Sequence, residues 1–202
     1  EIRLSLVGSE MCIRDSYYTS EEDIVASLNG VYTSLTQSYV ADNYHYFTDV
    51  RANATVVTNS GANSGIPYQF YNYTLTEENV YVYNRYSQLY KIISRANTLF
   101  AHLGDVSYAT PSARDTYEAE ARFLRALSYY WLVTEWGDVP LVLKVLESTE
   151  EVRANNYRRP KAEIYQAIFD DLKYVTESPL LDVQPASACG KVSKAAAWAL
   201  WG

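Results

Sequence analysis

The feature that most constrains this chain is residues 117–141, which have the pattern of one long helix with a defined end. Arg114, Glu118 and Arg122 follow one another at intervals of four, so they can form ion pairs along one face. Residues 126–133 contain a single polar side chain, which is typical of a helix enclosed by other helices. The sequence therefore predicts a buried central helix around which the rest of the chain packs.

A glycine and a proline mark the end of this helix. Gly137 stands where a residue in the left-handed conformation commonly closes a helix, and Pro140 cannot continue one. Within the helix, Arg122 and Arg125 have two interpretations. They could contact an anion or a partner, or they could pack their stems on apolar surface and pair with Glu118 or helix-end carbonyls. The buried setting favours the second, structural interpretation.

Further helices are expected where apolar residues recur at helical spacing, with Ser20 and Ser193 as N-caps. They should cover residues 21–38, residues 77–102, a stretch from near 160 to before 179, and a last helix after residue 193. Residues 143–156 lack a clear period. The predicted fold is all-α, with tetratricopeptide-like helix pairs in a right-handed superhelix. Because the helix starts keep no fixed period, long irregular loop insertions are expected as well.

Residues 39–79 form the longest of these insertions and are the candidate ligand site. Loops of this length are uncommon in compact domains and are usually functional. Aromatic rings beside amide, carboxylate and guanidinium groups suit a sugar, which offers an apolar face and many hydroxyls. The alternative is a loop pinned to the helices by its own tyrosines. The candidate contacts are Asp49, Arg51, Asn53, Tyr68 and Tyr71.

Charge and composition exclude several classes of function. The net charge of −7 offers no basic surface for nucleic acid or for an anionic bilayer. No apolar run approaches the roughly 20 residues of a membrane-spanning helix. Cys12 and Cys189 provide neither a disulfide framework nor a metal site. We expect no cofactor and no bound metal.

Enzyme activity also finds little support in the sequence. His45 and His102 have no companions at ligand spacing, and the common nucleophile and phosphate-binding motifs are missing. Of the adjacent pair Asp170 and Asp171, one should be solvated and the other an ion-pair or cap residue. The least favoured hypothesis is that Asp42 and Asp49 are the opposed carboxylates of a glycosidase. The chain is therefore predicted not to be an enzyme.

Three ordered segments resemble the SusD/RagB family. They are AEARFLRA with WGDVPL at residues 119–126 and 136–141, RPKAEIY at 159–165, and GKVSKAAA at 190–197. In the last segment Lys191 replaces the arginine usual in the family. The resemblance covers roughly residue 19 to the end. It implies a tetratricopeptide-like N-terminal part, with a C-terminal part outside this sequence.

The resemblance also implies a function. Members are surface-exposed, lipid-anchored outer-membrane proteins of Bacteroidetes-type bacteria, active in polysaccharide utilization. They bind glycans or other nutrients beside a SusC-like TonB-dependent transporter. A glycan ligand, such a transporter partner and an outer-membrane location are thus expected here, with the lipid anchor missing from this sequence. The competing hypothesis is a helical-repeat scaffold that recognises a protein partner.

The chain is expected to consist of a short leader and one helical domain. Residues 1–16 resemble read-through of a sequencing adapter and are expected to be a non-native leader. Residues 17–202 are expected to form the SusD-like helical domain, cut in mid-helix at its C-terminus.

Overall fold

The protein is described by a computed structural model over residues 18–57 and 65–202, so the predicted leader at 1–16 lies outside the described residues. The described part is helical, and its one extended pairing is an isolated bridge between Val139 and Arg159. The all-α prediction is therefore confirmed. In chain order the elements are α1 (Glu21–Leu35), η3 (Tyr46–Val50), α2 (Gly65–Tyr71), α3 (Val80–His102), α4 (Ala113–Trp136), α5 (Thr149–Asn155), α6 (Lys161–Glu177), η4 (Ala186–Ala188) and α7 (Lys194–Trp201).

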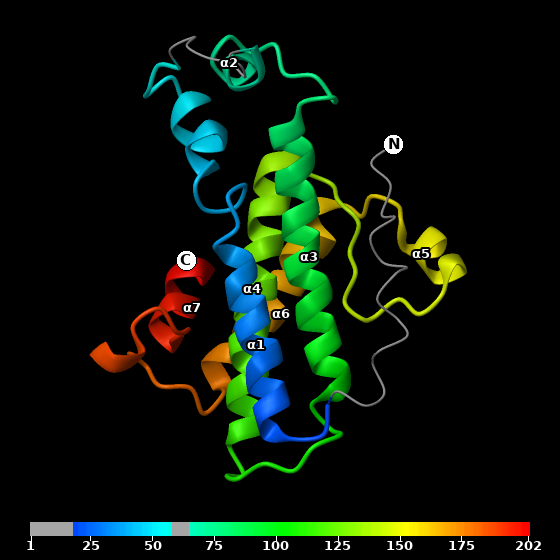
Figure 1. Ribbon diagram of the computed structural model, residues 1–202, viewed down its shortest axis with the longest axis vertical. Coiled ribbons are helices and arrows are strands. Elements are labelled where there is room, and N and C mark those ends of the chain that lie inside the picture. The colour runs from blue at the N-terminus through cyan, green and yellow to red at the C-terminus, as the bar shows by residue number, and fades with distance from the viewer. Residues whose placement is uncertain (1–17, 58–64) are drawn as a thin grey trace.

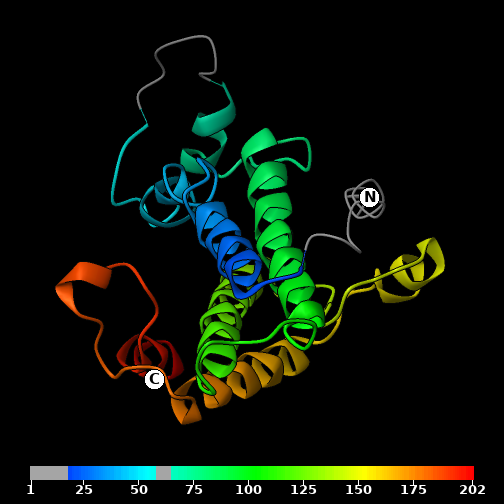
Figure 2. The same ribbon diagram turned by 60° about the horizontal axis from the view of Figure 1, so that its bottom comes forward.

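Four long helices build the core in layers. Helices α1 and α3 run side by side over one face of α4, and α6 packs along its other side (Figures 1 and 2). Helix α7 lies against α6, whereas α5 projects from the bundle on a separate arm (Figure 1). The segment between α1 and α3 rises above one end of the bundle, where it holds η3 and α2.

Helix α4 is the buried centre that the sequence predicts. Ala119, Leu124 and Leu132 are at most 1% exposed, and Tyr130 is the one exposed residue between 119 and 133. The small residues Ala121 and Ala126 of α4 are fully buried as well. Each fully buried leucine stabilises the fold by roughly 1.5–3 kcal/mol relative to an exposed one.

The helix ends follow the expected capping chemistry. Ser20 Oγ accepts from the Asp23 amide, and the Asp23 carboxylate accepts from the Ser20 amide, which makes a complete capping box on α1. Ser193 caps α7 by accepting from the amide of Ala196. Helix α4 ends at Gly137, whose φ of +74° favours glycine. These three sequence predictions are confirmed.

The arginines of α4 have the structural role that the sequence favours. Arg125 donates Nε and Nη2 to the two carboxylate oxygens of Asp171 on α6, at 2.8 and 2.7 Å. Arg122 bridges Asp171 and Glu118, at 2.8 and 2.7 Å. Asp171 is 2% exposed whereas Asp170 is exposed, as predicted for this pair. This network joins α4 to α6 inside the core.

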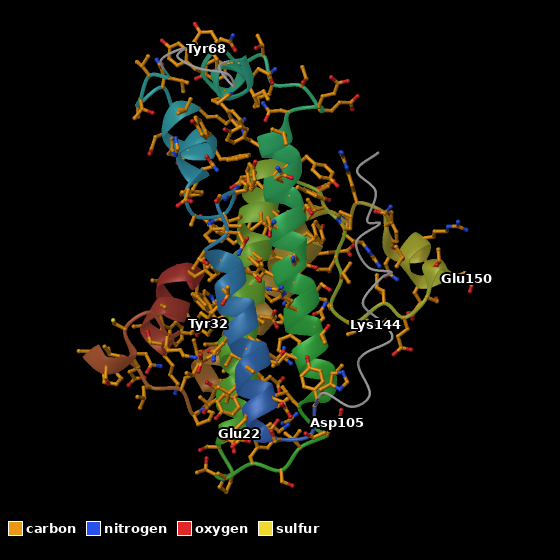
Figure 3. The ribbon with its side chains drawn as sticks, viewed as in Figure 1. Glu22, Tyr32, Tyr68, Asp105, Lys144 and Glu150 are labelled. Atoms are coloured by element: carbon orange, nitrogen blue, oxygen red, sulfur yellow. The ribbon has the colours of Figure 1, made fainter. Side chains whose placement is uncertain are left out.

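Helix α7 is attached through Tyr32 of α1. The Tyr32 hydroxyl donates to the Glu120 carboxylate at 2.6 Å and accepts from the Val192 amide at 3.0 Å. Lys191 lies 3.4 Å from the same carboxylate, with its ammonium over the Tyr32 ring. Tyr32 lies on the side of α1 that faces α7 (Figure 3). Lysine at position 191 therefore supplies a cation that binds both groups.

Two regions expected to be irregular contain helical turns. Residues 39–79 include η3 and α2, and the stretch 143–156 includes α5. The second long helix begins at Val80, capped by Asn79, and not at residue 77. Short helices of this kind have little stability of their own, so local periodicity does not reveal them. They depend on caps and on tertiary contacts instead.

Candidate functional site

Residues 36–57 and 65–79, hereafter the lobe, stand above the ends of α3 and α4 (Figure 1). The lobe has a small core of its own. Phe47 and Val50 of η3 are buried with Phe70 of α2, and the rings of Phe47 and Phe70 meet edge to face at 4.9 Å. Trp136, at the end of α4, packs against this core. The sequence thus folds a second, aromatic cluster on top of the bundle.

Arg85 of α3 fastens the lobe to α4. Its Nε and Nη2 donate to the two carboxylate oxygens of Glu135, each at 2.6 Å. Its Nη1 donates to the main-chain carbonyls of Tyr39 at 3.1 Å and Val40 at 3.2 Å. Arg85 is completely buried, and an unpaired charge there would cost several kcal/mol. The two carbonyls and the carboxylate are therefore held in a fixed arrangement.

Aromatic rings complete the surroundings of this guanidinium. Its central carbon lies 4.9 Å from the centroid of the Tyr44 ring, 4.8 Å from that of Phe47 and 5.5 Å from that of Trp131. Such contacts stabilise a desolvated cation by up to about 2 kcal/mol each. Arg85 therefore holds both the start of the lobe and the rings of its first half.

The five predicted contact residues all lie on the lobe. Asp49 belongs to η3, and Arg51 and Asn53 follow in the turn behind it; all three are exposed. Their side chains have no hydrogen-bond or ion-pair partner among residues 18–57 and 65–202. Tyr68 and Tyr71 lie on α2, half-buried, with ring centroids 5.6 Å apart. Tyr68 occupies the far tip of the lobe in Figure 3.

The structure brings these residues together only in part. Tyr68 and Tyr71 form one pair, and Tyr71 also packs on the core of the lobe. The Tyr73 hydroxyl donates to the main-chain carbonyl of Arg51 at 2.7 Å, which ties the end of α2 to the turn after η3. Asn53 adopts a φ of +58°, a conformation that asparagine tolerates better than most residues. No hydrogen bond joins Asp49 or Asn53 to the tyrosine pair within the described ranges.

A cleft of about 140 Å³ opens where the lobe meets the bundle. Of the predicted contacts, only Arg51 lines it. Burial raises the pKa of the Glu135 carboxyl in this cleft, and the Arg85 guanidinium offsets part of that rise. The cleft is lined by Phe47, Arg51, Leu75, Thr76, Val82, Glu135 and Trp136.

Glu135 and Trp136 are the residues that sequence reasoning missed. Glu135 is a carboxylate that follows the apolar second half of α4, a position that could have indicated a buried partner. Its partner Arg85 is fifty residues away, so no local pattern connects the two. Trp136 belongs to the predicted end of the central helix, and no local pattern indicates that the lobe packs against it.

In the described ranges, no three His, Cys, Asp or Glu side chains gather closely enough to hold a metal ion. His102 stacks on Tyr18 and contacts Asp105 at 2.8 Å, and His45 contacts the carbonyl of Asp42. None of the helices in this part of the chain has the length and apolar content needed to cross a bilayer.

Comparison with known proteins identifies the family. Residues 13–201 match a family profile described as "Starch-binding associating with outer membrane", of the SusD-like kind. The chain belongs to the SusD-like family. Two SusD-like proteins of Formosa agariphila, P2 and P25, are similar to it, with 29% identity over 185 residues and 27% over 192. Each alignment covers 91% of this chain, and 36% and 35% of the respective relative.

Solved structures share the fold of this SusD-like chain. A laminarin-binding SusD-like protein superposes with a TM-score of 0.77 at 28% identity, over 91% of this chain and 39% of that protein. Surface glycan-binding protein A of Bacteroides thetaiotaomicron, in complex with laminarihexaose, gives 0.73 at 21% identity, over 90% and 38%. At the latter identity the likeness concerns the fold alone. The predicted fold class, all-α with helix pairs in a tetratricopeptide-like superhelix, is confirmed.

The SusD-like chain spans a little over a third of the length of the relatives it matches. SusD-like carbohydrate-binding proteins are not catalysts, which agrees with the prediction of a binding protein. The suspected SusD/RagB membership is thus confirmed, while the individual contact residues stay a prediction.

Proposed function

We propose that this chain binds a neutral glycan of the glucan type on its lobe, as a step in nutrient capture at the bacterial surface. The observation that carries the proposal is the set of exposed polar side chains Asp49, Arg51 and Asn53, which make no hydrogen bond within the described residues, on a lobe that also presents the Tyr68–Tyr71 pair. The family description names starch, and one relative at 28% identity is named for laminarin. Both are polymers of glucose.

The binding mechanism follows from the chemistry of these groups. A sugar ring can stack its C–H face on Tyr68 or Tyr71, while its hydroxyls need hydrogen-bond partners to replace water. Asp49 provides acceptors, Arg51 donors, and the Asn53 amide both. Because Arg85 fixes the base of the lobe, the main chain at the start of the lobe is held in place before the ligand arrives, which lowers the entropic cost of binding. No covalent bond changes.

Titration calorimetry of the chain with laminarihexaose and with maltohexaose tests the proposal. We expect saturable binding of at least one of the two oligosaccharides. Tyr68→Ala should weaken it about tenfold, equivalent to about 1.4 kcal/mol. Tyr157→Ala is the control, since Tyr157 is exposed and lies after α5, away from the lobe. Equal affinities of both variants would move the site off α2.

The competing functions predict different results with the same two oligosaccharides. A glycoside hydrolase would release new reducing ends from either oligosaccharide, so a flat reducing-end assay dismisses it. A scaffold for a protein partner would show no heat with any glycan. Neither outcome depends on knowing the exact sugar sequence.

Delivery to a transporter is the further part of the proposal. We infer that the full-length protein stands on the outer-membrane surface, held by a lipid anchor, beside a SusC-like TonB-dependent transporter. The family description, which places its members in association with the outer membrane, supports this inference. Cross-linking in intact cells followed by mass spectrometry would test it. Recovery of the protein without any TonB-dependent receptor would contradict the partnership.

A further inference from the structure

The walls of the cleft come from both the lobe and the bundle. The lobe supplies Phe47, Arg51, Leu75 and Thr76, and the bundle supplies Val82, Glu135 and Trp136. The Arg85 ion pair holds the two walls together, because it links the start of the lobe to Glu135. The shape of the cleft is therefore fixed by a buried interaction and not by surface loops alone.

The lining combines the two surfaces that a sugar ring requires. Trp136 and Phe47 give an aromatic side, with their ring centroids 6.2 Å apart. Glu135, Thr76 and Arg51 give a polar side. Each oxygen of Glu135 accepts one hydrogen bond from Arg85, and a carboxylate has about four acceptor positions, so acceptor capacity is left over.

Two further polar groups line the cleft. The Thr76 hydroxyl and the Arg51 guanidinium have no side-chain hydrogen bond to any residue of 18–57 or 65–202, and both residues are exposed at the cleft. The Arg51 guanidinium can donate hydrogen bonds, the Thr76 hydroxyl can donate and accept, and the Glu135 carboxylate can accept. Neighbouring hydroxyls of a sugar ring need both kinds of partner.

The volume limits what the cleft can hold. At about 140 Å³ it is much larger than the ~15 Å³ that a single water requires, and smaller than the ~300–1,000 Å³ of pockets that enclose drug-sized ligands. A cleft of this volume suits one sugar ring and is too small for an oligosaccharide.

We propose that this cleft is a subsite for one sugar ring of the bound glycan, stacked on Trp136 and hydrogen-bonded by Glu135, Thr76 and Arg51. The inference rests on the proposed glycan binding and adds residues from α4 to a site otherwise confined to the lobe. Arg51 lies on both surfaces and connects them. The remaining rings of the glycan then run along the outside of the lobe.

Blocking the cleft tests the proposal. In Thr76→Phe a bulky ring replaces an exposed, uncommitted side chain at the rim, so the fold should be kept and thermal unfolding should confirm it. Thr55→Phe makes the same exchange at another exposed threonine of the lobe that does not line the cleft. We expect Thr76→Phe to weaken binding of laminarihexaose or maltohexaose at least tenfold, and Thr55→Phe less than twofold. Thr76→Ala, which removes only the hydroxyl, should weaken binding two- to fivefold.

The outcomes separate the two proposals. If the unaltered chain binds an oligosaccharide and all three variants bind equally well, the cleft is not a subsite, while glycan binding by the lobe stands. If the unaltered chain binds neither oligosaccharide, the proposed function fails and the subsite fails with it. If Thr76→Phe unfolds, Thr76→Ala decides in its place, and unchanged affinity in that variant overturns the subsite.

Discussion

At the scale of single residues, Asp171 has the most demanding position in the protein. It is 2% exposed and accepts hydrogen bonds from two arginines, Arg122 and Arg125, that belong to another helix. Buried carboxylates of this kind are tolerated because the opposite charges and the hydrogen bonds offset the loss of water. Removing the carboxylate therefore leaves Arg125 without its ion-pair partner and Arg122 with Glu118 alone.

Replacing this carboxylate gives the first prediction. Asp171→Asn should lower the free energy of unfolding by about 3–5 kcal/mol, the usual cost of an uncompensated buried charge. Urea unfolding monitored by circular dichroism measures it. Asp170→Asn is the control one residue away, at an exposed position, and should change the value by less than about 0.5 kcal/mol. Equal losses in the two variants would contradict the network.

A second residue, Arg85, governs the lobe in the same way. Arg85→Lys keeps the charge, but an ammonium cannot reproduce the forked contact with Glu135 and the bonds to the two carbonyls of the lobe. We expect amide hydrogen exchange in residues 36–57 and 65–79 to rise at least tenfold. Lys91→Arg, the reverse exchange on the exposed side of α3, should leave this exchange unchanged. Unaltered protection in Arg85→Lys would show that the aromatic core alone holds the lobe.

At the scale of elements, similar N-caps contribute differently to the stability of the whole fold. Ser20 caps α1, which buries Ile24, Leu28 and Val31, whereas Ser148 caps α5, which buries nothing. The arm that carries α5 projects away from the bundle, with Lys144 and Glu150 on it (Figure 3). Unfolding of an element affects global stability only as far as that element packs against the rest.

Cap removal in the two helices tests this difference. Ser20→Ala should lower the free energy of unfolding by about 1 kcal/mol, since it removes one half of a capping box. Ser148→Ala removes the same kind of bond and should cost less than about 0.5 kcal/mol globally, while α5 itself loses hydrogen-exchange protection. A global loss as large as that of Ser20→Ala would mean that the arm stabilises the bundle.

At the scale of the whole molecule, acid stability depends on a contact between distant parts of the chain. Glu21, at the start of α1, accepts from the Ala109 amide and the Tyr117 hydroxyl, each at 2.7 Å. These bonds, chiefly that from the Ala109 amide, lower the pKa of the Glu21 carboxyl below its ordinary 4.5. The folded state therefore binds fewer protons than the unfolded one near this pH. The stabilisation is present above about pH 4.5 and is lost as the pH falls through the folded pKa.

Melting temperatures between pH 6 and pH 3 test whether stability falls with pH as predicted. The unaltered protein should lose stability as the pH falls below about 4.5, and Glu21→Gln should show a smaller loss over the same interval. Glu22→Gln is the matched control, because the Glu22 carboxylate is exposed at the same end of the molecule and has no hydrogen-bond partner in residues 18–57 and 65–202 (Figure 3). A steeper acid loss in Glu21→Gln would contradict the assignment.

The sequence by itself determined the long helices and several of their ends. The spacing of apolar residues in 117–141 predicted a buried central helix, and Ser20, Ser193 and Gly137 act as the caps that their chemistry predicted. These features depend on residues within one or two turns of one another, so a linear pattern contains them. The family motifs added what such local patterns cannot supply, namely the order of the helices in space.

Only the tertiary structure decided where the lobe stands and what faces it. The pairs Arg85–Glu135 and Arg125–Asp171 join residues 50 and 46 positions apart. The cleft depends on the first of these pairs, because it is lined by residues of both the lobe and the bundle. An arginine in a helical pattern looks the same whether its partner is water or a buried carboxylate. The choice between them is made by the packing of helices far apart in sequence, and that packing placed Glu135 and Trp136 beside Arg51.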